Sequence, residues 1–227
     1  MGTHIIKFVT AIVSVTVALS FTSAFSSEGS MRQYPMHAAA LENNVDTVKQ
    51  LIDSGVEIDA RDQSGSTALL VAARANSIDA AEVLIEAGAD ANAKDNINDS
   101  AYLYSGARGH LEILKMTLAH GADLNSTNRY GGTALIPAAE RGHVETVQTL
   151  VESGVAIDHV NNLGWTALLE AIILGNGGES HQQIVNILLE AGANPNLADR
   201  DGVSPLQHAR ARGYHKIEQS LLAAGGQ

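Results

Sequence analysis

The sequence predicts an all-α solenoid, a stack of repeated units that each contain two short helices. Three observations support this fold class: a glycine that recurs every 33 residues, a Ser or Thr series in the same register, and two apolar segments with helical spacing in each unit. Periods of about 20–50 residues are typical of repeat architectures. Hydrophobic residues make up 45% of the chain but aromatic ones only 4%, which suits thin, closely stacked helices packed through Ala, Leu, Ile and Val.

Two residue series share one period along the chain. The glycine series consists of Gly55, Gly88, Gly121, Gly154, Gly192 and Gly225, with spacings of 33, 33, 33, 38 and 33 residues. The second series has the same spacings and consists of Tyr34, Thr67, Ser100, Thr133, Thr166 and Ser204. Because two different residue classes keep one register, the chain divides into six units.

Each unit indicates where its two helices begin and end. The Ser or Thr hydroxyl is placed to accept a hydrogen bond from the free backbone N–H groups of the first helix. That helix is short and apolar, as in Thr67–Ala73, and its two small Ala residues allow the next helix to approach closely. The second helix carries one apolar stripe, as in residues 184–189. The periodic glycine ends it, because glycine adopts a left-handed conformation at the least cost.

Four segments show a resemblance to the ankyrin repeat. They are Pro35-Met36-His37-Ala38-Ala39-Ala40, Gly88-Ala89-Asp90-Ala91-Asn92-Ala93, Arg141-Gly142-His143-Val144-Glu145 and Gly192-Ala193-Asn194-Pro195-Asn196. The resemblance implies an L-shaped stack of antiparallel helix pairs with projecting turns, or fingers, that binds proteins along its concave face. We place the six repeats, units 1 to 6, at residues 32–61, 62–94, 95–127, 128–160, 161–198 and 199–226.

The units depart from the family pattern in three ways. The family's usual His occurs only as His37, and the other units carry Leu70, Leu103, Ile136, Leu169 and Gln207 at that position. Pro137 removes a backbone donor from the first helix of unit 4, so we expect a small distortion there. Unit 5 has five extra residues around Asn176 to Ser180, between its two helices. Insertions in a solenoid lie on one face, often the binding face.

The N-terminal segment predicts export. Residues 1–24 have the pattern of a secretory signal peptide, with a basic Lys7, an apolar run from Phe8 to Phe21 and small residues up to Ala24. We expect cleavage after Ala24, with Ser26 as the alternative, and a short linker at residues 25–31. The apolar run of 14 residues is shorter than the roughly 20 that span a bilayer, so an uncleaved anchor is the weaker interpretation. The predicted location is the periplasm or the cell exterior.

The charge and the histidines argue against several functions. The net charge is −11 without a run of Lys and Arg, which disfavours nucleic acid and acidic lipid as partners. A basic protein partner is permitted, although the acidic surface also serves solubility. The chain has no Cys, no pair of His residues at i and i+4, and no Gly-x-Ser-x-Gly motif. We therefore predict that it is not an enzyme and holds neither a metal nor a cofactor.

The resemblance places the candidate contact residues in the fingers and on the exposed side of the first helices. These residues are Arg61, Ile97, Arg129, Tyr130, Leu163, Trp165, Ile173, Leu174 and Asn176. Ile97, Tyr130, Leu163 and Trp165 fall in consecutive fingers, so they should align on one face. Trp and Tyr are enriched at interface hot spots. The alternative for Trp165 is that it packs against the neighbouring finger.

These features predict a monomeric, non-catalytic scaffold of the periplasm or cell exterior that binds another protein through its concave face. The alternative comes from resemblance to exported ankyrin proteins. It is an accessory or immunity-type protein that supports a periplasmic enzyme such as a catalase, or that neutralises a toxic effector.

Overall fold

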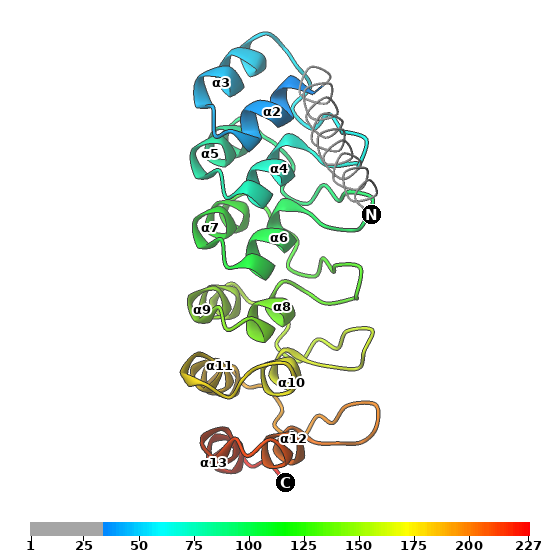
Figure 1. Ribbon diagram of the computed structural model, residues 1–227, viewed down its shortest axis with the longest axis vertical. Helices are drawn as coiled ribbons and strands as arrows, with labels where there is room; N and C mark the ends of the chain where they lie inside the picture. Colours follow the sequence, from blue (N-terminus) through cyan, green and yellow to red (C-terminus); the bar gives the residue numbers. More distant parts are fainter. Residues whose placement is uncertain (1–33) are drawn as a thin grey trace, which may run out of the picture.

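Six helix pairs form one stack in the computed structural model, which describes residues 34–227 (Figure 1). The inner helices lie beside the fingers and are α2 (Pro35–Leu41), α4 (Ala68–Ala75), α6 (Ala101–Arg108), α8 (Leu135–Glu140), α10 (Ala167–Ile173) and α12 (Pro205–Ala211). The outer helices are α3 (Val45–Asp53), α5 (Ile78–Glu86), α7 (Leu111–Ala119), α9 (Val144–Glu152), α11 (Glu179–Glu190) and α13 (His215–Ala223). The described residues contain no strand, so the predicted all-α class is confirmed.

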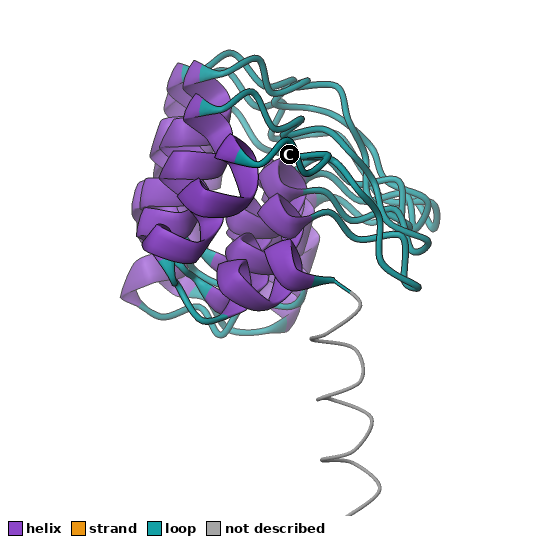
Figure 2. Ribbon diagram, turned by 90° about the horizontal axis from the view of Figure 1, so that it is seen from above, coloured by secondary structure: helices purple, strands orange, loops and turns teal. Residues whose placement is uncertain are grey.

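The fingers project from one side of the stack (Figure 2). Each finger joins an outer helix to the next inner helix, and together with the inner helices the fingers enclose a concave surface. The predicted signal peptide at residues 1–24 and the linker at residues 25–31 lie outside the part of the chain that the structure describes. Within residues 34–227, no helix combines the length and the apolar character needed to cross a bilayer.

Small side chains allow the inner helices to approach one another. Ala72 and Ala73 of α4 and Ala138 and Ala139 of α8 are fully buried between neighbouring units. Larger residues of the inner and outer helices complete the core between them, and the bulkiest fully buried ones include Leu69, Leu84, Ile113, Leu150, Leu168 and Ile184. The helices therefore pack mainly through Ala, Leu, Ile and Val, as predicted.

His37 forms the polar link that the other units lack. Its Nε2 donates a hydrogen bond to the Ser66 carbonyl oxygen of the next finger, at 2.8 Å. Leu70, Leu103, Ile136 and Leu169 occupy the same position in units 2 to 5 and are buried. Those units thus replace a hydrogen bond between helix and finger with apolar packing.

Four of the inner helices begin at the hydroxyl cap that the sequence predicts. The side chains of Thr67, Ser100, Thr166 and Ser204 each accept from the backbone N–H three residues later, at 3.2 to 3.3 Å. For Thr133 the prediction is wrong, because its Oγ1 is buried without a partner and α8 begins at Leu135. Pro137 supplies the reason. It has no N–H to donate to the Thr133 carbonyl, so the Ile136 N–H bonds that carbonyl instead of the hydroxyl.

This difference predicts opposite results for two identical substitutions. Thr166→Val removes a working cap and should lower the free energy of unfolding by about 1 kcal/mol. Thr133→Val removes an unpaired buried hydroxyl and should leave stability unchanged or raise it slightly. Urea denaturation of both variants measures the difference. Equal losses would show that the Thr133 hydroxyl contributes as much as the Thr166 hydroxyl.

Of the five extra residues of unit 5, Asn176 to Gly178 lie between its two helices, as predicted, and Glu179 and Ser180 form the start of the outer helix. Helix α11 has 12 residues, whereas the other outer helices have 9. The finger of unit 5 precedes the N-terminal end of α10, and the inserted loop follows its C-terminal end. The loop therefore lies at the end of the helix pair opposite the fingers. There the hydroxyl of Tyr214 donates to the Gly175 carbonyl oxygen at 3.0 Å. The loop is thus packed against the next unit.

Candidate functional site

Every finger from unit 2 onward is built around one Asp or Asn side chain. The five residues are Asp62, Asp95, Asn128, Asn161 and Asp199. In each, one side-chain oxygen accepts backbone N–H bonds from the residues two and four positions later. An Asp or Asn side chain holds a tight turn in this way. All five fingers therefore share a conformation.

Because the turns are alike, the residue two positions after the Asp or Asn lies at the tip of each finger. In units 3, 4 and 5 that position is Ile97, Tyr130 and Leu163, whose side chains are 48%, 56% and 50% exposed. The Arg129 guanidinium lies 4.9 Å from the centre of the Tyr130 ring. Trp165 is only half-buried, at the base of the same finger as Leu163. Three apolar side chains are thus exposed on consecutive fingers.

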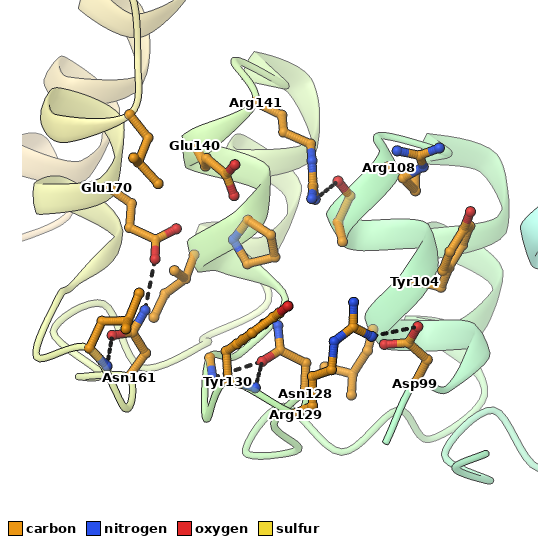
Figure 3. A pocket seen from close by; sticks show the side chains of 17 residues that line it. Asp99, Tyr104, Arg108, Asn128, Arg129, Tyr130, Glu140, Arg141, Asn161 and Glu170 are labelled. Atoms are coloured by element: carbon orange, nitrogen blue, oxygen red, sulfur yellow. Dashed lines mark hydrogen bonds and ion pairs between the residues drawn. The ribbon is translucent and has the colours of Figure 1, made fainter. Parts of the chain in front are cut away.

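A groove of about 590 Å³ lies between these fingers and helices α6, α8 and α10 (Figure 3). Four of the predicted contact residues line it, namely Arg129, Tyr130, Leu163 and Leu174. The other five do not line it, and they are Arg61, Ile97, Trp165, Ile173 and Asn176.

Two of the residues outside the groove have structural contacts. Arg61 donates to the carbonyl oxygens of Gly65 and Lys94, which links its finger to the next one. Asn176 Oδ1 accepts from the Gly178 N–H at 2.8 Å, just before α11 begins. Their side chains thus stabilise the finger and the inserted loop in which they lie.

Three carboxylates that were not among the predicted residues also line the groove, Asp99, Glu140 and Glu170. Glu170 lies in the first turn of α10, is only 5% exposed, and accepts from Asn161 Nδ2 at 2.7 Å through Oε1. Burial, and secondarily the charge of Glu140, raise the pKa of Glu170 to about 7, against the opposing effects of Asn161 and Arg141. The sequence signal for this site was a single Glu inside the apolar helix Ala167–Ile173.

In unit 5 the carboxylate lies on the helix, whereas in two other units it lies on the finger. Two other fingers carry an Asp that contacts a basic side chain of a helix: Asp95 lies 2.5 Å from Arg74, and Asp199 lies 2.7 Å from His208. In unit 5 the finger has the neutral Asn161 and the helix supplies the carboxylate. Within residues 34–227, Glu170 forms no ion pair with Lys, Arg or His. The groove therefore holds a buried carboxylate without a cation.

The cationic end of the groove has its own partners. Arg129 Nη1 lies 3.6 Å from Asp99 Oδ2. Arg74 and Arg108 lie 5.8 and 5.7 Å from the centre of the Tyr104 ring. Figure 3 shows Asp99, Arg129, Arg108 and Tyr104 at one end and Glu140 and Glu170 at the other. The groove is thus electrostatically polarised along the stack.

Comparison with known families agrees with this architecture. A model of ankyrin repeats in three copies matches residues 13–95 and 102–199, which is most of the chain. This chain belongs to the ankyrin-repeat family. Ankyrin repeats are generally scaffolds for protein interaction, because their stacking creates an extended concave surface. The groove described above lies on that surface.

Solved ankyrin-repeat structures resemble the whole stack. An ankyrin repeat domain from Acinetobacter baumannii AYE is 68% identical, with a TM-score of 0.84, and the match covers 86% of this chain and 100% of that one. The ankyrin repeat protein EF0377 is 42% identical, with a TM-score of 0.80 over 83% of this chain and 96% of that one. The ankyrin repeat domain of Bcl-3, described as a unique member of the IkappaB family, is 29% identical, with a TM-score of 0.76 over 85% and 86%.

A curated relative matches over a shorter stretch. The protein named "Putative ankyrin repeat protein YahD" of Escherichia coli (strain K12) is 54% identical over 56 residues. That match spans 25% of this chain and 28% of the relative. Because it is so short, this match supports membership of the repeat family and says nothing about function.

Proposed function

We propose that this protein is a non-catalytic scaffold that binds another protein in the groove between the fingers of units 3 to 5 and helices α6, α8 and α10. The observation that supports the proposal is the row of exposed apolar fingertips, two of which border the groove. Contiguous exposed apolar surface usually marks a contact site. Tyr is also among the residues that dominate binding energy.

Several histidines have a structural role, because they join neighbouring units of the stack. His110 Nδ1 donates to the Ala73 carbonyl oxygen at 2.9 Å. His181 Nε2 donates to the Glu140 carbonyl oxygen at 2.9 Å. Each of these bonds joins one unit to the next. The proposed scaffold acts as a monomer, and the net charge of −11 favours a protein partner over nucleic acid.

The double variant Tyr130→Ala and Leu163→Ala tests this function. It should weaken binding of the protein partner, identified by cross-linking in the source cells, by at least tenfold (about 1.4 kcal/mol), because both side chains are exposed beside the groove. Calorimetric titration measures the affinity. The control is Leu222→Ala, which removes an equally exposed apolar side chain from α13, outside the groove. If both variants bind equally well, the groove is not the contact site.

We also propose that the protein acts in the periplasm or outside the cell. The support is the sequence pattern of residues 1–24. If the pattern acts as a signal peptide, mass spectrometry of the protein purified from its source should find an N-terminus at Phe25, or at Ser27 if cleavage follows Ser26. An intact Met1 would contradict export through this segment.

A further inference from the structure

The two glutamates at the acidic end of the groove form no ion pair with the described residues. Glu140 of α8 and Glu170 of α10 both line the groove, and neither forms an ion pair within residues 34–227. Glu170 is nine-tenths buried, and Asn161 donates to only one of its two carboxylate oxygens. A buried charge is normally paired, because removing it from water is costly. Glu170 avoids this cost by taking up a proton below its pKa of about 7, and above that pH the charged carboxylate can be paired by a cation from outside the chain.

The charges around Glu170 come from two elements. On α8, Glu140 raises the pKa of Glu170 and Arg141 lowers it, while on the finger the Asn161 amide lowers it. Arg141 forms no ion pair with Glu170, and its guanidinium donates to the Ala107 carbonyl oxygen at 2.7 Å, toward α6 (Figure 3). The two glutamates therefore create a local negative potential at this end of the groove.

Apolar side chains line the same groove as the carboxylates. Leu163 on the finger and Leu174 at the far end of α10 are each 50% exposed and line the same groove. Lys and Arg combine a flexible aliphatic stem, which packs on apolar surface, with a terminal cation. The groove offers complementary chemistry for both parts of such a side chain.

We propose that the groove binds a lysine or arginine side chain of the protein partner, with its cation between the carboxylates of Glu140 and Glu170 and its methylene groups against Leu163 and Leu174. This inference rests on the proposed function and specifies the partner's chemistry at that site. The partner segment thus carries a basic residue at its centre.

A library of synthetic heptapeptides of random sequence tests the inference. The purified protein is screened at pH 8, and the tightest peptide is titrated calorimetrically against the protein. We expect the selected peptides to be enriched in Lys or Arg beside apolar residues. Glu170→Gln should weaken the tightest peptide at least tenfold, because one partner of a buried charge pair is lost. Glu190→Gln, the same change of charge on the exposed outer helix α11, should have no effect.

A double-mutant cycle then tests the contact itself. Replacing the basic residue of the peptide with Gln should cause the same loss, and Glu170→Gln should weaken this second peptide no further. Lowering the pH from 8 to 5.5 should weaken the basic peptide at least tenfold with the unmodified protein, since protonation removes the carboxylate charge. The Glu170→Gln variant should lack this pH dependence.

The outcomes separate the inference from the proposed function. Peptides without basic residues that lose affinity with Tyr130→Ala would overturn the inference and leave the groove as the binding site. Peptides insensitive to both Tyr130→Ala and Glu170→Gln would count against both. A library without any bound peptide would overturn the inference, while the protein partner itself still tests the function.

Discussion

Glu170→Gln is expected to stabilise the folded protein at pH 8 by about 3 kcal/mol and to have little effect near pH 4. Burial raises the pKa of Glu170 from 4.5 to about 7. Between these values the folded state keeps a proton that the unfolded state has lost, so this carboxyl makes the folded state less stable as pH rises. Gln is neutral throughout, and its side-chain oxygen accepts the Asn161 hydrogen bond in the same way.

Urea denaturation at pH 4, 6 and 8 measures this effect. The advantage of Glu170→Gln over the unmodified protein should grow from pH 4 to pH 8. Glu190→Gln is the matched control, because it removes the same charge from a chain of net charge −11 at an exposed site. A similar gain in both variants would assign the effect to reduced overall repulsion. A loss of stability at pH 8 would show that the carboxylate is paired in solution.

If Glu170→Gln raises stability, Glu170 itself lowers the stability of the folded protein. Side chains that lower stability persist where function needs them. The buried carboxylate should therefore weaken the fold while it strengthens the binding of a cationic side chain. The same variant would then gain stability and lose affinity, a combination that a purely structural residue does not show.

Gly177→Ala is expected to lower the free energy of unfolding by about 3 kcal/mol, for two additive reasons. Gly177 has a φ of +66°, which L residues adopt at a cost. A methyl group there would also lie 2.5 Å from Cδ1 of Tyr214. The Tyr214 ring cannot move away freely, because its hydroxyl is bonded to the Gly175 carbonyl oxygen.

Gly213→Ala provides the matched control. Gly213 has nearly the same φ, +68°, but a methyl group there would have no atom within 4 Å. Its cost should be about 1 kcal/mol, from the backbone conformation alone. Urea denaturation of both variants isolates the steric part. In a Tyr214→Ala background the additional cost of Gly177→Ala should fall to the level of Gly213→Ala. Equal losses in the native background would show that the inserted loop is not packed against Tyr214.

The sequence alone was sufficient for features that depend on a few neighbouring residues. The register of Gly55 and its successors, the caps at Thr67 and Thr166, and the exposed fingertips Tyr130 and Leu163 all follow from position within one repeat. Each unit repeats the same local chemistry, so a pattern established in one unit applies to the next. Thr133 is the exception, because Pro137 removes the N–H that its carbonyl would otherwise accept.

Only the tertiary structure revealed features that join different units. The groove, the approach of Glu140 to Glu170, and the packing of Tyr214 against Gly177 depend on side chains that are far apart in sequence and meet through stacking. The sequence by itself determined a stack of six ankyrin repeats with apolar fingertips. The tertiary structure decided that a buried carboxylate faces the groove without a cation, because charge pairing depends on distances between units that no repeat pattern contains.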